Sequence, residues 1–253
     1  MRTIQHSYAQ VLVFADAQAF RRAVADEFLR AARAAILERG CFTVALAGGS
    51  TPRSSYALLA EDERNGIAGL AWDQVEVFFG DERMVPADHP DSNYRMAREA
   101  LLSQTPIRPE RIHRVQTELE ATGAAAQYEA EIRSVFRLAP EGAPRFDLIL
   151  LGMGPDGHTA SLFPGSAALE ETKRLVCSNW VEKLKSHRIT FTFPLLNAAA
   201  LDLFAVAGTD KARMVRDVLR GDSAGTIYPA QRVKPTSGRL VWMLDEAAAS
   251  ELK

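Results

Sequence analysis

Cysteine is scarce in this chain, which has two, Cys41 and Cys177, among 253 residues. They lie far apart and form no C-x-x-C pair, so their spacing indicates neither a zinc site nor a dithiol redox centre. No two histidines have the H-x-x-x-H spacing of metal ligands either. Such sparse use of cysteine fits a reducing compartment, and we expect a cytoplasmic protein.

Long apolar runs and an excess of one charge are also missing. No uninterrupted apolar stretch approaches the roughly 20 residues of a membrane-spanning helix, and the N-terminal sequence MRTIQHSYAQ lacks the apolar core of a signal peptide. The 30 lysines and arginines are balanced by 32 aspartates and glutamates, for a net charge of -2. Without a basic stripe, we expect neither nucleic acid nor membrane as a partner.

What the chain does contain is an alternation of short apolar runs and helical patterns. We expect strands over residues 11–14, 42–47, 75–79, 112–115, 148–151, 188–193, 203–207 and 241–244. We expect helices over residues 17–38, 52–60, 121–138, 194–200, 210–219 and 245–250, and one ending near 102, with Asp16 and Thr51 as N-caps of the first two. This alternation predicts an α/β fold, a three-layer αβα arrangement around a doubly wound, mostly parallel sheet. With no linker-like segment and no repeat, we expect one domain over residues 1–253.

Three of the expected strands end in polar or glycine-rich turns, at residues 48–51, 80–83 and 152–158. The carboxyl ends of parallel strands meet at one edge of the sheet, where open α/β proteins bind their ligands. The three turns therefore predict a common site.

The first turn, Gly48-Gly49-Ser50-Thr51, leads into an expected helix. Glycines let an anion approach the backbone, and the N-terminus of a helix offers free N–H groups and a partial positive charge. The turn is thus a candidate phosphate cradle. It is equally compatible with a tight turn in which Thr51 only caps the helix. No Gly-Lys-Ser/Thr follows, so it is not a P-loop.

The second turn, Gly80-Asp81-Glu82-Arg83, places two acids and an arginine directly after an apolar strand. Arginine suits the binding of phosphate or carboxylate through its planar guanidinium. A solvated turn with a local ion pair is the commoner fate of such a triplet, so on its own the second turn indicates little.

The third turn, residues 152–158, reads G-M-G-P-D-G-H, and a helix is expected to begin just after it, at Thr159 or Ala160. It matches G-x-G-x-x-G, but it lies mid-chain, and no acid follows at the end of the next strand, as a dinucleotide site requires. Pro155 also removes a backbone donor. What remains is His158 as a general base, with Asp156 to fix its tautomer.

Other candidates are weaker. Ser161 lies three residues after His158 on the expected helix, but no G-x-S-x-G elbow surrounds it, so we interpret it as structural. A basic run precedes the strand at residue 188, and a further lysine follows the strand at 203–207. Either could hold an anionic substrate or be solvated, and the residues are Lys183, Lys185, His187, Arg188 and Lys211.

Taken together, these stretches resemble the glucosamine-6-phosphate isomerase/6-phosphogluconolactonase family, and its lactonase branch in particular. The resemblance covers nearly the whole chain. It rests on ALAGGSTP (45–52), FFGDERMVP (78–86), SNY (92–94), LGMGPDGHTASLFP (151–164), RITFTFPLLNAA (188–199) and YPAQRV (228–233). It implies hydrolysis of 6-phosphoglucono-1,5-lactone to 6-phosphogluconate in the pentose phosphate pathway, a soluble sugar-phosphate substrate, and no metal or cofactor.

Two alternatives remain. The related deaminases resemble G-x-D-G-H-I-A-F-N-E-P, with a catalytic glutamate five residues after the histidine, and here that position is Phe163. Phenylalanine cannot transfer the extra protons that ring opening and amine loss need. Related folds also act as non-catalytic sugar-phosphate sensors, against which the presence of Asp156 and His158 argues. Many lactonases have a proline-rich segment before the R-I-T strand, whereas this chain has VEKLKSH (181–187).

The resemblance and the residues together give an expected mechanism. Phosphate lies at residues 48–51, clamped by Arg188 and helped by Lys211. His158, oriented by Asp156, takes a proton from the attacking water and returns it to the ring oxygen. Arg83 or backbone N–H groups stabilise the oxyanion, and Asp81 orders water or a substrate hydroxyl.

Overall fold

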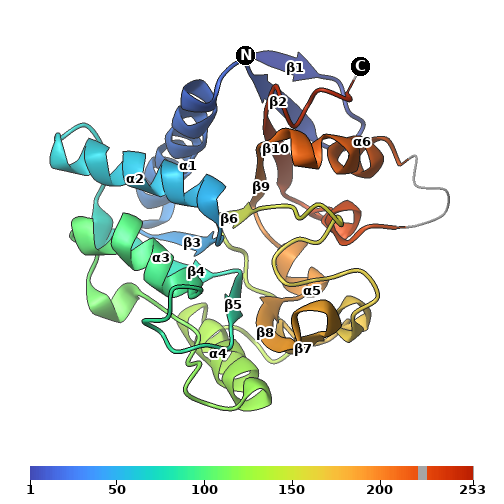
Figure 1. The fold of residues 1–253 in the computed structure, drawn as a ribbon. Coiled ribbons are helices and arrows are strands. Elements are labelled where there is room, and N and C mark those ends of the chain that lie inside the picture. The colour runs from blue at the N-terminus through green and yellow to red at the C-terminus, as the bar shows by residue number, and fades with distance from the viewer. Residues whose placement is uncertain (222–226, 253) are drawn as a thin grey trace.

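The structure is a computed structural model that describes residues 1–221 and 227–252. Residues 222–226 and 253, which the expected domain includes, lie outside the described residues. A main sheet runs through the centre in the order β1-β2-β10-β9-β6-β3-β4 (Figure 1). Its strands are β1 (Arg2–Ile4), β2 (Gln10–Phe14), β3 (Phe42–Leu46), β4 (Val75–Phe79), β6 (Leu148–Leu151), β9 (Leu201–Val206) and β10 (Arg239–Asp245). All neighbouring pairs are parallel except β1 with β2.

Helices cover both faces of this sheet. They are α1 (Ala17–Arg39), α2 (Ser50–Arg64), α3 (Asn93–Ala100), α4 (Ala121–Val135), α5 (Phe193–Leu196) and α6 (Ala212–Arg220). Apolar side chains of α1, α2 and α3 share one core cluster with one face of the sheet, and those of α4, α5 and α6 share the other. The predicted three-layer α/β arrangement is therefore confirmed. Among the described residues, no helix is both long and apolar enough to cross a membrane.

The local signals at α1 act as the sequence predicts. The Asp16 carboxylate accepts a hydrogen bond from the Ala19 N–H at 2.8 Å, which satisfies one of the free donors of the first turn. Gly40 ends the helix with a φ of 71°, a left-handed conformation that glycine adopts without strain.

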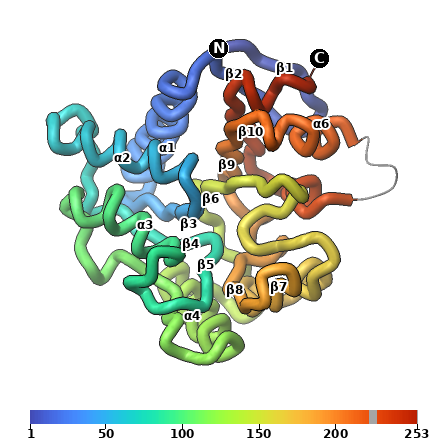
Figure 2. Tube along the Cα trace, viewed as in Figure 1, coloured from blue at the N-terminus to red at the C-terminus, as the bar shows by residue number. Residues whose placement is uncertain are grey.

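A second, smaller sheet was not predicted. It is antiparallel, with the order β5-β8-β7, and its strands are β5 (Asp81–Arg83), β7 (Val176–Val181) and β8 (Ser186–Phe191). Residues 81–83, interpreted from the sequence as a turn, are thus a strand, in which Asp81 pairs with Thr190 and Arg83 with Arg188. Figure 2 shows this sheet near α4, which contacts β7 and β8.

Four other expectations need correction. No helix begins at Thr159 or Ala160, because Ala160 has a φ of 47° and the chain turns there. Helix α2 begins at Ser50 with Gly49 as its N-cap, so Thr51 is not the cap. The glycine, with a φ of 104°, takes a conformation that threonine would resist.

Residues 246–251 form turns rather than the expected helix. Residues 112–115 do not form the expected strand and contribute one bridge, from Ile112 to Val77.

His113 forms an ionic cluster between β4 and α4. Its Nδ1 lies 2.8 Å from Glu131 and its Nε2 lies 2.9 Å from Glu76, while the ring stacks on Phe78. Burial alone would lower the pKa of His113, but the hydrogen bonds that its ring donates to both carboxylates outweigh burial and raise that pKa to about 9.

This cluster predicts a pH dependence of stability. The folded protein holds a proton on His113 that the unfolded chain releases near pH 6.5, so the stabilisation is complete below that pH and is lost as pH rises towards 9. We expect the free energy of unfolding to fall by about 1–2 kcal/mol between pH 7 and 9, and H113Q to remove that slope. Urea denaturation across the range measures this fall, with H89Q, at a partly exposed histidine, as the control. An unchanged slope in H113Q would assign the effect to another group.

Candidate active site

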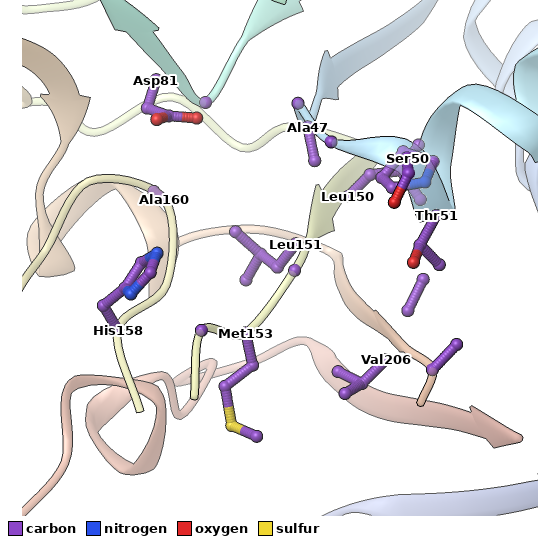
Figure 3. Close-up of a pocket in the computed structure, with 18 of the residues that line it drawn as sticks. Ala47, Ser50, Thr51, Asp81, Leu150, Leu151, Met153, His158, Ala160 and Val206 are labelled. Atoms are coloured by element: carbon purple, nitrogen blue, oxygen red, sulfur yellow. The ribbon is translucent and has the colours of Figure 1, made fainter. Parts of the chain in front are cut away.

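A cavity of about 300 Å³ lies at the carboxyl ends of β3, β4, β6 and β9 (Figure 3). The chain passes from β3 to β4 on one side and later returns to β6 on the other, so β3 and β6 flank the point where the strand order reverses. Open α/β sheets bind ligands at such a point. Residues from all three predicted turns line the cavity, together with Lys211, and they are Gly48, Gly49, Ser50, Thr51, Gly80, Asp81, Arg83, Gly152, Met153, Gly154, Pro155 and His158.

One wall of the cavity is the start of α2. Ser50 and Thr51 are its first two residues, and no acidic residue occupies the first turn to offset the partial positive charge of the helix. Gly48, just before this helix, leaves room for Asn93, since a Cβ there would lie 1.8 Å from the Asn93 side-chain oxygen. Lys211 also lines this cavity, and its Nζ lies 2.9 Å from Asp210. This wall offers backbone donors, hydroxyls and an ammonium group to an anion.

His158 lies across the cavity from Ser50 and Thr51 (Figure 3). Its Nδ1 lies 2.5 Å from the Asp156 Oδ1, and 25% of its side chain is exposed. A proton on Nδ1, donated to Asp156, leaves Nε2 as the acceptor. Asp156 itself does not line the cavity. The predicted pair is therefore assembled, with the carboxylate behind the imidazole.

Asp156 is held as a carboxylate. Burial alone would raise its pKa, but hydrogen bonds from His158 and from Lys183 outweigh burial and keep the pKa well below its ordinary value. Its contact with His158 therefore stabilises the imidazolium form once His158 has taken a proton.

Two of the three glycines in the turn are sterically required. A Cβ on Gly154 would lie 2.1 Å from the His158 ring, and one on Gly157 would lie 2.8 Å from Tyr228. Gly157 also has a φ of 77°. Gly152, in contrast, has open space where its Cβ would be. Gly154 thus lets the imidazole fold back onto its own loop and Gly157 makes room for Tyr228, roles unlike those of a dinucleotide fingerprint.

Phe163 lies directly against the imidazole. Its ring stacks on His158 with the centroids 4.1 Å apart, and the side chain is buried. The Lys183 ammonium lies 4.6 Å from the centre of the same phenyl ring. The position that resembles the deaminase glutamate is therefore filled by an aromatic surface for the histidine.

Asp81 is fixed by residues from two other segments. Its Oδ2 accepts a hydrogen bond from the Ser161 hydroxyl at 2.6 Å, and its Oδ1 accepts one from the Asn93 amide at 3.2 Å. Ser161, predicted to be structural within a helix, instead lies in a turn and orients a carboxylate of the cavity. Arg83, which also lines the cavity, donates a hydrogen bond to the Asp91 carbonyl oxygen at 2.5 Å.

Glu82 lies between Asp81 and Arg83 in β5, and its side chain is buried. Its carboxylate accepts hydrogen bonds from the backbone N–H groups of Asn93 and Tyr94 at 2.7 and 2.8 Å, at the start of α3. Burial raises the pKa of Glu82, and these N–H groups limit the rise. Glu82 therefore joins β5 to α3.

Arg188 does not line the cavity. It pairs with Arg83 across β5 and β8, and its Nη1 donates to the Ser186 hydroxyl and the His187 carbonyl at 2.9 and 3.0 Å. Burial and then the neighbouring Arg83 lower the pKa of Arg188. Neither Lys185, which contacts Glu182, nor His187, which packs against Trp180, belongs to the cavity wall.

Sequence reasoning missed Asn93 and the roles of Ser161, Lys183 and Glu82, since each acts through a contact distant in sequence. Only the SNY stretch at residues 92–94 gave a signal, as part of the family resemblance. Within residues 1–221 and 227–252, no group of three or more His, Cys, Asp or Glu side chains is arranged to hold a metal ion.

Comparison with known proteins shows which family the chain is similar to. The family model for glucosamine-6-phosphate isomerases and 6-phosphogluconolactonases matches residues 15–242. A 6-phosphogluconolactonase from Nostoc sp. is 43% identical over 219 residues, covering 86% of this chain and 88% of that protein. The structure of 6-phosphogluconolactonase from Trypanosoma brucei is 31% identical, with a TM-score of 0.85, over 98% of this chain and 100% of the other.

A monomeric glucosamine-6-phosphate deaminase is similar in fold alone, at 18% identity and a TM-score of 0.79 over 95% of this chain and 99% of that one. The predicted similarity to the deaminase fold is therefore confirmed. Because the family model spans most of the sequence and the relatives match it almost end to end, the chain belongs to the glucosamine-6-phosphate isomerase/6-phosphogluconolactonase family.

Proposed function

We propose that this protein hydrolyses 6-phosphoglucono-1,5-lactone to 6-phosphogluconate, as the names of its relatives indicate for them. The observation that carries the proposal is the placement of His158. Its imidazole, backed by a carboxylate, lies across one small cavity from the start of a helix. Hydrolysis of a sugar-phosphate lactone needs a site of both kinds, an anion site for the phosphate and a base at the reacting carbon.

We place the phosphate at the start of α2. The backbone N–H groups and hydroxyls of Ser50 and Thr51 donate to its oxygens, and Lys211 supplies the countercharge. Arg188 contributes indirectly, through the charge it adds beside Arg83. The volume of about 300 Å³ lies at the lower end for small-molecule sites, which suits a monosaccharide.

The chemistry then requires two proton transfers. The neutral His158 Nε2 takes a proton from water as the oxygen attacks the lactone carbonyl, and Asp156 stabilises the imidazolium that forms. Arg83 stabilises the oxyanion of the tetrahedral intermediate, and Asp81, fixed by Ser161 and Asn93, binds a hydroxyl of the ring. The C–O bond to the ring oxygen breaks as His158 returns its proton to that oxygen.

Deamination would need a further proton donor near the ring. Phe163 takes the place of the glutamate of the deaminase motif and is stacked against His158. It can hold the imidazole but cannot exchange a proton. The arrangement therefore supports the lactonase over the deaminase.

A panel of three assays tests this proposal. With fresh 6-phosphogluconolactone, a pH indicator should show acid release far above the spontaneous rate. Glucosamine 6-phosphate should give no ammonia. Ammonia release would identify a deaminase instead, and sugar-phosphate binding measured by calorimetry without turnover would identify a sensor.

A further inference from the structure

The imidazole of His158 is held without the help of a helix. Its loop follows β6 and turns at Gly157, so the ring orientation depends on side-chain contacts. Two contacts fix it, the hydrogen bond to Asp156 and the stacked ring of Phe163. Whatever holds these two side chains also holds the imidazole.

Lys183 contacts both of them. It lies in the short 3-10 helix Glu182–Leu184, at the tip of the hairpin between β7 and β8. Its Nζ contacts the Asp156 Oδ2, the oxygen that does not face His158, and it lies 4.6 Å from the centre of the Phe163 ring. Asp156 is therefore shared between a lysine on one oxygen and the imidazole on the other.

We propose that Lys183 is a positioning residue for His158, which sets both the orientation of the imidazole and the balance between its neutral and protonated forms. The proposal rests on the role of His158 in the proposed lactone hydrolysis. A carboxylate beside an imidazole favours imidazolium. A cation on the other side of that carboxylate opposes this effect, and so maintains the neutral imidazole that can accept a proton from water.

The other charges near the ring come from separate elements. Asp81 and Arg83 of β5 and Lys211 before α6 line the same cavity, with one negative and two positive groups. Glu182, beside Lys183, is engaged by Lys185 and by the Trp180 indole N–H. Replacing Lys183 therefore removes the cation in contact with Asp156 and leaves these other charges unchanged.

Stability is a poor readout for this contact, because the Lys183 side chain is 51% exposed and exposed ion pairs contribute little. The test instead compares K183M, K183R and K185M, the last a matched control on the same hairpin. We expect the acidic limb of the kcat/KM profile in K183M to move up by about 0.5–1 pH unit, which lowers activity at pH 6 about 3- to 10-fold. KM should stay within about twofold, because the phosphate contacts remain, while K183R and K185M should follow the wild type.

The second readout is the titration of the His158 ring in the free protein, followed by NMR of the imidazole nuclei. In K183M, the midpoint of this titration should rise together with the acidic limb of the kcat/KM profile. If both stay at their wild-type positions, Lys183 is only a surface ion pair and the proposal is wrong. If the wild type fails to hydrolyse the lactone, the proposed function is wrong, yet the ring titration still decides whether Lys183 acts on His158.

Discussion

We expect H158Q to lower kcat for hydrolysis of 6-phosphogluconolactone by about 10²–10⁴-fold, the usual contribution of one general base. Glutamine keeps much of the size and polarity of the side chain but cannot take a proton from water. The residues proposed to bind the phosphate, Ser50, Thr51 and Lys211, lie elsewhere on the cavity wall, so KM should change by no more than a few-fold. Stopped-flow or indicator assays, corrected for spontaneous hydrolysis, measure both constants.

H187Q is the matched control, because His187 belongs to the basic run before β8 but does not line the cavity. It should retain nearly full activity. A folded H158Q protein with near-normal turnover would show that another group activates the water, and would overturn the assignment of His158.

The second large effect is expected from a single methyl group. G154A places a Cβ 2.1 Å from the His158 ring, and the ring is confined by Phe163 and Asp156. The imidazole must leave its position or the loop must shift, and misplacement of a catalytic group by about 1 Å can cost about 10²-fold in rate. We therefore expect kcat to fall at least that far.

G152A is the control on the same turn, since nothing lies within 4 Å of its added Cβ. It should keep most of the activity. Circular dichroism and thermal melts establish that both variants fold. Equal activities in folded G154A and G152A would mean that the loop adapts freely, and that the position of His158 is not set by the glycine.

Much of the main architecture could be predicted because it depends on local patterns. The run at residues 148–151 is apolar throughout, as befits a strand buried on both faces, and Asp16 and Gly40 mark the ends of α1. The convergence of the three turns followed from parallel topology alone. Asp81, Arg83, His158 and Lys211 accordingly line one cavity, as the sequence indicated.

The second sheet could not be predicted in the same way. Strand β5 is three residues long and charged throughout, so it has no alternating apolar pattern, and its partners lie about a hundred residues away on β8. The same holds for the loop after β6. Its residues favour a helix, but Ala160 adopts a left-handed conformation while Ser161 bonds to Asp81 and Thr190. Tertiary contacts override the local preference there.

The buried carboxylate of Glu82 limits which mutations β5 can accept during evolution. In a strand, neighbouring side chains point to opposite faces, so Glu82 faces α3 while Asp81 and Arg83 line the cavity. Which of the three side chains face the cavity is therefore set by their position along the strand. Substitutions within it alter one chemical group at a time, but inserting or deleting one residue would exchange the two faces, bringing the glutamate to the substrate and burying an arginine beneath α3. Evolution can tune the charges of this strand far more readily than its length.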